Sequence, residues 1–200
     1  MQHYYSSSQE NLEHDYQTIQ YTLLKQTMQF TTDNGVFSKK MIDYGSRALL
    51  ASFEEPNVEG KILDVGCGYG TFGLTIAKAF DRDVELVDVN ERALDLARGN
   101  ARLNKVLDNV KIYQSNVYDQ VSGQFAAIVT NPPIRAGKKV VHQILEEAFD
   151  YLKNQGELWV VIQKKQGAPS AKKKMQEIFG NCEIVSKDKG YYILKSQKSS

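Results

Sequence analysis

The chain has 200 residues, of which 42% are hydrophobic and 24% charged, and its net charge of +1 is ordinary for a soluble globular domain. Residues 1–7 lack the features of a secretory signal and no apolar run is long enough to span a bilayer, so we expect a cytoplasmic protein. Two distant cysteines, Cys67 and Cys182, and three scattered histidines predict neither a disulfide framework nor a metal site.

The first 55 residues are predicted to form an N-terminal extension, and we place the main domain at residues 56–200. Asn34-Gly35 favours a tight turn, because both residues tolerate positive φ, and Pro56 disfavours a helix that continues through it. After a polar lead-in, we therefore expect strands over 19–24 and 27–32, a turn at 33–35 and a helix over 41–53.

From residue 61 onward, short apolar segments alternate with amphipathic segments. The predicted strands cover 61–65, 84–89, 110–114, 125–130, 157–162, 182–186 and 191–195, and the predicted helices cover 71–80, 91–104, 138–153 and 170–179. This alternation predicts an α/β fold with a mostly parallel sheet and helices on both faces. The last two strands are joined by a tight turn at 187–190 and must be antiparallel.

A glycine-rich turn follows the first of these strands, with the sequence Asp64-Val65-Gly66-Cys67-Gly68-Tyr69-Gly70. Glycines at this end of a central parallel strand let the backbone approach a ligand closely. Part of the turn also matches the dinucleotide pattern G-x-G-x-x-G, which leaves a nicotinamide cofactor as an alternative. Asp64 favours S-adenosylmethionine instead, because a carboxylate attracts an α-ammonium and repels a pyrophosphate. The plainer alternative is that Asp64 only caps the turn.

Polar side chains also follow the next two strands. Asp88 is suited to accept both hydroxyls of an adenosine ribose, beside Val89, and this role fits either cofactor. After the third strand, Asn116 is suited to pair with the adenine edge, with Val117 next to it. These residues predict an adenosine site without choosing between the two cofactors.

The sequence Asn131-Pro132-Pro133-Ile134 directly follows the strand over 125–130. Two prolines fix the backbone and remove two N–H donors, so that carbonyl groups can face a cleft. The Asn131 side-chain oxygen and the Pro132 carbonyl then form an acceptor pair that can hold an amino group for methyl transfer. The alternative is an ordinary proline-stiffened turn.

Basic residues gather in the last third of the chain. Residues 1–133 carry 12 Lys and Arg against 17 Asp and Glu, whereas residues 134–200 carry 13 against 7. A one-sided basic surface suits a polyanionic partner, although the run at 172–174 is as readily explained as a solvated helix face. We expect RNA phosphates to contact Arg135, Lys138, Lys164 and Lys165.

The turn at 64–70 and the sequence at 131–134 together resemble the amino-methyltransferase branch of the class I S-adenosylmethionine-dependent methyltransferases. The surrounding sequence resembles the RsmC-type ribosomal RNA guanine-N2 methyltransferases and their single-domain YbxB-type relatives. The resemblance implies a Rossmann-like sheet of order 3-2-1-4-5-7-6 with strand 7 antiparallel. It also implies that Phe37 packs beside the cofactor and that ribosomal RNA is the partner. We expect a monomer, with a weak dimer as the alternative.

Two residues depart from the family pattern. Ile134 stands where many relatives have an aromatic that stacks on the target base, and Asn116 stands where relatives have an acid. Ile134 therefore leaves three hypotheses open: methylation of guanine N2, methylation of another nucleobase or a glutamine amide, and binding of cofactor and RNA without turnover.

Overall fold

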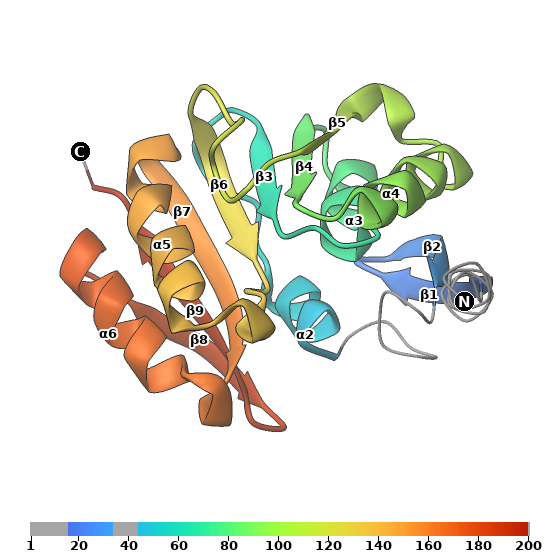
Figure 1. Ribbon diagram of the computed structural model, residues 1–200. Coiled ribbons are helices and arrows are strands. Elements are labelled where there is room, and N and C mark those ends of the chain that lie inside the picture. The colour runs from blue at the N-terminus through green and yellow to red at the C-terminus, as the bar shows by residue number, and fades with distance from the viewer. Residues whose placement is uncertain (1–15, 34–43, 200) are drawn as a thin grey trace, which may run out of the picture.

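A seven-stranded sheet with helices on both faces and a separate two-stranded hairpin make up the computed structural model, which describes residues 16–33 and 44–199 (Figure 1). The hairpin consists of β1 (Tyr16–Leu23) and β2 (Gln26–Asp33). The sheet has the order β5-β4-β3-β6-β7-β9-β8. Its strands are β3 (Ile62–Val65), β4 (Val84–Asp88), β5 (Val110–Gln114), β6 (Phe125–Thr130), β7 (Leu152–Gln163), β8 (Glu183–Asp188) and β9 (Tyr191–Gln197).

The strand order confirms the predicted topology. Numbered from the first core strand, the observed order is 3-2-1-4-5-7-6. Strands β3 to β7 pair in parallel, whereas β9 pairs antiparallel with both β7 and β8. The carboxyl ends of the parallel strands therefore share one edge of the sheet, at which open α/β sheets bind their ligands.

Helices bury both faces of the sheet. Two separate clusters of buried apolar side chains fill the two interfaces. The hairpin, α2 (Tyr44–Ser52), α3 (Thr71–Ala79) and α4 (Glu91–Leu103) cover one face, and α5 (Lys138–Ala148) and α6 (Ala168–Phe179) cover the other. The central strands β3 and β6 are buried along their whole length, as a two-sided sheet requires.

Two side-chain amides of the α4 region bind the N-terminal hairpin, because they pair with backbone N–H and carbonyl groups of β2 as the backbone of a neighbouring strand would. Asn100 accepts a hydrogen bond from the backbone N–H of Thr31 at 2.7 Å and donates to the Thr31 carbonyl at 3.0 Å, and Asn104 pairs in the same way with Gln29. The Asn100 amide also donates to the Tyr69 carbonyl at 2.9 Å. The hairpin is thus linked through Asn100 to the glycine-rich turn.

One predicted helix ends earlier than the sequence indicated. We expected a helix over 138–153, but α5 ends at Ala148, a short 3-10 turn covers Phe149–Tyr151, and β7 begins at Leu152. Tertiary packing overrides the helical spacing here. The Tyr151 ring stacks on Tyr118 at 4.7 Å between centroids, and Leu152 is fully buried against β6.

Other boundaries differ by a few residues. The hairpin turn falls at Leu24-Lys25, both with positive φ, and β8 continues to Asp188, so that the last turn is shorter than predicted. Helix α6 begins two residues before the predicted start and contains Pro169 in its first turn. The predicted turn residues 34 and 35 and the first three residues of the predicted helix at 41–53 lie outside the described residues.

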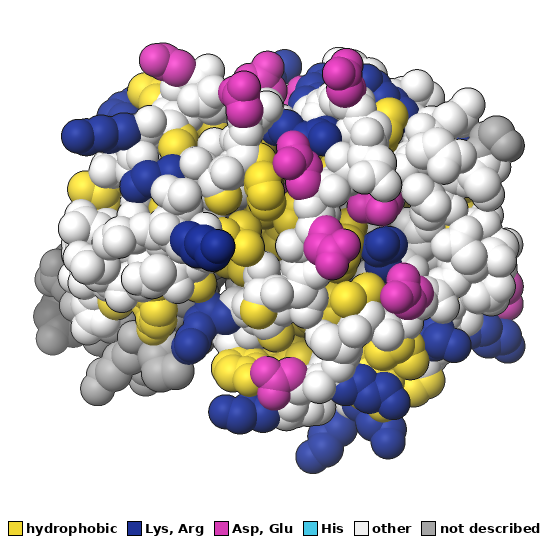
Figure 2. All heavy atoms as spheres, turned by 180° about the vertical axis from the view of Figure 1, so that it is seen from behind, with side chains coloured by type: hydrophobic (Ala, Val, Ile, Leu, Met, Phe, Trp, Pro, Cys, Tyr) yellow, Lys and Arg dark blue, Asp and Glu magenta, His cyan; other side chains and the backbone are white. Residues whose placement is uncertain are grey.

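Charge is distributed unevenly over the surface. The lower edge of the molecule in Figure 1 is formed by one end of α6 and the β8–β9 turn, and β6 ends above it. Seen from behind, this lower edge carries mostly Lys and Arg side chains, whereas most acidic side chains lie in the middle and upper parts (Figure 2). On the face that Figure 2 shows, the lower edge is therefore the more basic part of the surface.

Candidate active site

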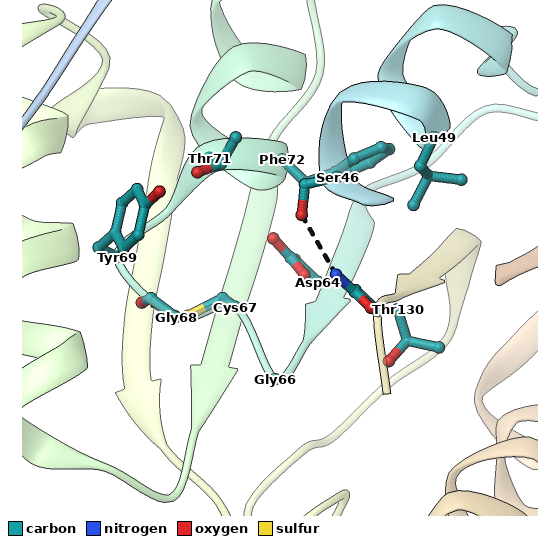
Figure 3. Close-up of a pocket in the computed structure, with 11 residues that line it drawn as sticks. Ser46, Leu49, Asp64, Gly66, Cys67, Gly68, Tyr69, Thr71, Phe72 and Thr130 are labelled. Atoms are coloured by element: carbon teal, nitrogen blue, oxygen red, sulfur yellow. Dashed lines mark hydrogen bonds between the residues drawn. The ribbon is translucent and has the colours of Figure 1, made fainter. Parts of the chain in front are cut away.

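Two cavities meet at the glycine-rich turn. The first, which we call the Asp64 cavity, has a volume of about 190 Å³ and lies between this turn, the start of α2 and the end of β6 (Figure 3). The second, the Asp88 cavity, has about 340 Å³ and lies between the turn, the ends of β4 and β5, and α5. Both cavities are lined by Gly66 and Gly68, so one backbone segment separates them.

The conformation of the turn explains its glycines. Gly66, Gly68 and Gly70 have φ values of 73°, 57° and 104°, a region that side chains with a Cβ rarely adopt. A Cβ at Gly70 would lie 2.5 Å from Leu74 Cδ1, so this position excludes a side chain on packing grounds as well. The chain can therefore turn sharply from β3 into α3 and leave its backbone exposed to both cavities.

Asp64 places a buried carboxylate at the wall of the first cavity (Figure 3). Its Oδ2 accepts a hydrogen bond from the Gly73 backbone N–H at 2.9 Å. Burial raises the pKa of Asp64 to about 7; the Gly73 hydrogen bond opposes this rise and the nearby Asp88 carboxylate adds to it. A cation placed in the cavity would therefore strongly stabilise the ionised form of this carboxyl group.

Asp88 lies in the wall of the second cavity at the end of β4. Its Oδ2 accepts from the Gly68 N–H at 2.9 Å and its Oδ1 accepts from the Asn90 N–H at 3.0 Å. The predicted partners Val89, Asn116 and Val117 line the same cavity. Val89 is 58% exposed and Val117 is buried, and both offer apolar surface to this cavity.

The sequence at 131–134 forms a rigid turn that touches three cavities. Thr130 Oγ1 donates to the Val65 carbonyl at 3.0 Å, which ties the ends of β6 and β3 together. Asn131 lines the Asp64 cavity and directs its Nδ2 toward Ser46 Oγ at 3.5 Å. Pro133 lines the Asp88 cavity, and the Pro132 carbonyl accepts no hydrogen bond from the described residues.

Ile134 does not share a cavity with Asn131. It begins a short 3-10 turn, Ile134–Ala136, and lines a third cavity of about 210 Å³ between α5 and α6, which we call the Ile134 cavity. The sequence had suggested that this side chain contacts the target base beside Asn131. In the structure the two residues line different cavities, with Pro133 between them in the wall of the Asp88 cavity.

The four basic residues predicted to contact RNA are exposed near this turn. Arg135 lies in the 3-10 turn Ile134–Ala136, Lys138 is the first residue of α5, and Lys164 and Lys165 lie in the 3-10 turn that precedes α6. Within residues 16–33 and 44–199, their side chains form neither a hydrogen bond nor an ion pair. They are available to a polyanion.

Sequence reasoning missed several residues of the Asp64 cavity. Ser46 and Leu49 come from α2, and no local pattern indicates that this helix closes the cavity. Thr71, Phe72 and Thr130 directly follow or precede the recognised motifs, and their position beside them was the available signal. The predicted Phe37 contact lies outside the described residues.

Cys67 contributes a buried thiol to the wall of the Asp64 cavity. Burial raises the pKa of the Cys67 thiol well above its ordinary value, so the neutral thiol acts as an apolar part of the wall. The described part of the chain contains no group of three His, Cys, Asp or Glu side chains that can hold a metal ion. None of its helices is both long and apolar enough to cross a membrane.

Comparison with known proteins identifies relatives of the same fold. An uncharacterized protein of Bacillus subtilis, YbxB, is 54% identical over 200 residues, which cover 98% of each chain. The ribosomal RNA small subunit methyltransferase C of Erwinia tasmaniensis is 32% identical over 171 residues, which cover 82% of this chain and 48% of that protein. This chain thus spans nearly all of the first relative and about half of the second.

A solved structure agrees with the observed architecture. The Thermus thermophilus 16S rRNA N2 G1207 methyltransferase (RsmC), in complex with AdoMet and guanosine, superposes with a TM-score of 0.81 at 23% identity. The match covers 92% of this chain and 50% of that one and shows the shared fold. The methyltransferase small domain family matches residues 27–195. The chain therefore belongs to the methyltransferase small domain family.

Proposed function

We propose that this protein transfers the methyl group of S-adenosylmethionine to an exocyclic amino group, namely N2 of a guanine in small-subunit ribosomal RNA. The observation that carries the proposal is the pair of cavities joined at Gly66 and Gly68, each with one carboxylate in its wall. We further take residues 56–200 as the methyltransferase domain and residues 1–55 as an extension packed on it.

The two cavities fit the two ends of the methyl donor. In this proposal Asp64 holds the α-ammonium, which is the cation that its raised pKa calls for. Asp88 accepts the ribose hydroxyls, Val89 and Val117 contact the adenine faces, and Asn116 pairs with the adenine edge. A dinucleotide fits less well, because its pyrophosphate would face the Asp64 carboxylate next to the same turn.

Within residues 131–134, Asn131 and Pro132 supply the acceptor half. Asn131 Oδ1 and the Pro132 carbonyl hold the guanine amine, so that its nitrogen lone pair is aimed at the methyl group. S-adenosylmethionine supplies that methyl on an electrophilic sulfonium. The amine nitrogen forms a bond to the methyl carbon as the carbon–sulfur bond breaks, the bonding pair remains on sulfur, and water accepts the proton lost from nitrogen. The chain therefore needs no strong general base.

The choice of substrate rests on relatives and on charge. The relatives from Erwinia tasmaniensis and Thermus thermophilus are named as ribosomal RNA methyltransferases, and the second name specifies N2 of a guanine. Arg135, Lys138, Lys164 and Lys165 are exposed and have no ion-pair partner among the described residues, which supports an RNA substrate through phosphate contacts. They argue against a glutamine amide of a protein as the acceptor.

Transfer of a labelled methyl group tests the proposal. The protein is incubated with methyl-labelled S-adenosylmethionine and small ribosomal subunits from a strain that lacks it, and the RNA is then digested to nucleosides. We expect label in N2-methylguanosine. Label in N6-methyladenosine would show that the substrate is an adenine instead of a guanine. Binding of S-adenosylmethionine with no labelled nucleoside would support a binding protein without turnover.

A further inference from the structure

The Ile134 cavity lies on the opposite side of α5 from the Asp88 cavity and has no role in the reaction proposed above. We propose that it binds one nucleobase of the RNA strand, a neighbour of the methylated guanine. The inference rests on the proposed RNA substrate. It adds to the proposed function a second site that binds a base of the same RNA.

The walls of the cavity suit the faces of a planar ring. Ile134, Val141 and Ile162 provide apolar surface from three different elements, the 3-10 turn, α5 and the end of β7. Gly137 and Gly167, which precede α5 and α6, also line the cavity and add no side chain to its walls. A single base can enter edge first and be held between aliphatic side chains, which provides a sequence-tolerant contact.

The polar side chains of the cavity suit the edge of a base. His142 Nε2 lies 3.2 Å from Ser170 Oγ, and both residues line the cavity. Burial lowers the pKa of His142, with the Lys138 and Lys174 charges acting in the same direction, against Glu146 and Glu177. The imidazole is therefore mainly neutral at pH 7 and offers one donor and one acceptor, as a base edge requires.

Charge around the entrance favours a nucleotide over an uncharged ligand. Lys138 lines the cavity itself, and Lys164 and Lys165 immediately precede its Gln166 and Gly167 wall. None of these three lysines is neutralised by an ion pair within the described residues. The phosphates on either side of an inserted base would neutralise them.

The cavity is separate from the reaction centre. An ion pair between Glu146 and Lys174 joins α5 to α6, which form its two sides. Asn131, which holds the target amine in the proposed reaction, faces the Asp64 cavity instead. Because the proline-stiffened turn stands between them, a strand that enters both places must present two different bases.

Binding of two labelled RNAs tests this inference without requiring methyl transfer. Both are single-stranded nonamers with a central guanosine and a terminal fluorescein; in one, the flanking positions are abasic. Fluorescence anisotropy should show that the wild-type protein binds the intact nonamer about tenfold more tightly than the abasic one. Ser170→Trp, which fills the cavity, should bind both with the weaker affinity. Lys173→Trp, on the exposed side of α6, is the matched control and should behave as wild type.

The outcomes separate this inference from the proposed function. Equal affinity of the wild-type protein for both nonamers, or full discrimination by a folded Ser170→Trp variant, would overturn it. If that variant fails to fold, His142→Ala provides the second test, because it removes the polar edge without filling the cavity and should reduce discrimination about threefold. Discrimination without any methyl transfer to ribosomal RNA would contradict the proposed function alone.

Discussion

Replacement of Asp64 by asparagine is expected to stabilise the folded protein at pH 8 and to weaken the binding of S-adenosylmethionine at least tenfold. The asparagine oxygen can still accept the Gly73 N–H, so the helix start is preserved. What is lost is the charge that the α-ammonium requires. The same carboxylate thus lowers the stability of the free protein and strengthens its binding of S-adenosylmethionine.

The pH dependence of this effect has a definite sign. The pKa of Asp64 is about 7 in the folded protein against an ordinary 3.8, so the folded state holds an extra proton between these values. Wild-type stability therefore falls as pH rises through this window, and the full cost is present above pH 7. The advantage of Asp64→Asn in the free energy of unfolding should grow by roughly 3 kcal/mol between pH 5 and pH 8.

Urea unfolding of both proteins at several pH values measures this difference, and calorimetry measures the affinity for S-adenosylmethionine. Asp81→Asn is the matched control, because Asp81 is exposed and should show neither effect. Affinity of the wild-type protein should rise with pH through 7, whereas that of Asp64→Asn should stay constant. A variant that binds the cofactor as tightly as wild type would show that Asp64 does not hold the ammonium.

Replacement of Asn131 by alanine is expected to lower the rate of methyl transfer by about 100-fold to 1000-fold and to change cofactor affinity less than threefold. The side chain lines the Asp64 cavity beside Ser46, and its oxygen is one of the two acceptors proposed for the target amine. Without it, the amine is held only by the Pro132 carbonyl. The lone pair then no longer points toward the methyl group.

Single-turnover methylation of ribosomal subunits measures this rate at saturating cofactor. Asn154→Ala, at an exposed position of β7, serves as the control for loss of an amide. Methyl transfer by Asn131→Ala at the wild-type rate would show that Asn131 takes no part in the reaction. Loss of cofactor binding in this variant would instead assign it to the donor site.

The sequence predicted the sheet well because its pattern is regular. Strands β5 and β6 have the predicted bounds, and the order of all seven strands follows from alternation and the family resemblance. The end of α5 was placed wrongly, since Phe149 continues the helical spacing while its ring packs against Phe179. Ring packing between elements is not visible in a local pattern.

The site was predictable where its residues follow strand ends. Asp64, Asp88, Asn116 and Asn131 all lie at the carboxyl edge of the parallel sheet, and their position there is a consequence of topology. Two features needed the structure. Ser46 reaches the Asp64 cavity from a helix far away in the sequence, and Ile134 turns into a separate cavity.

The central claim is that the joined Asp64 and Asp88 cavities hold S-adenosylmethionine. Isothermal titration with this cofactor, with NADH and with the Asp88→Ala variant tests it most directly. We predict one cofactor per chain at micromolar affinity, no heat with NADH, and affinity at least about tenfold weaker in Asp88→Ala. Clear binding of NADH without binding of S-adenosylmethionine would contradict the claim.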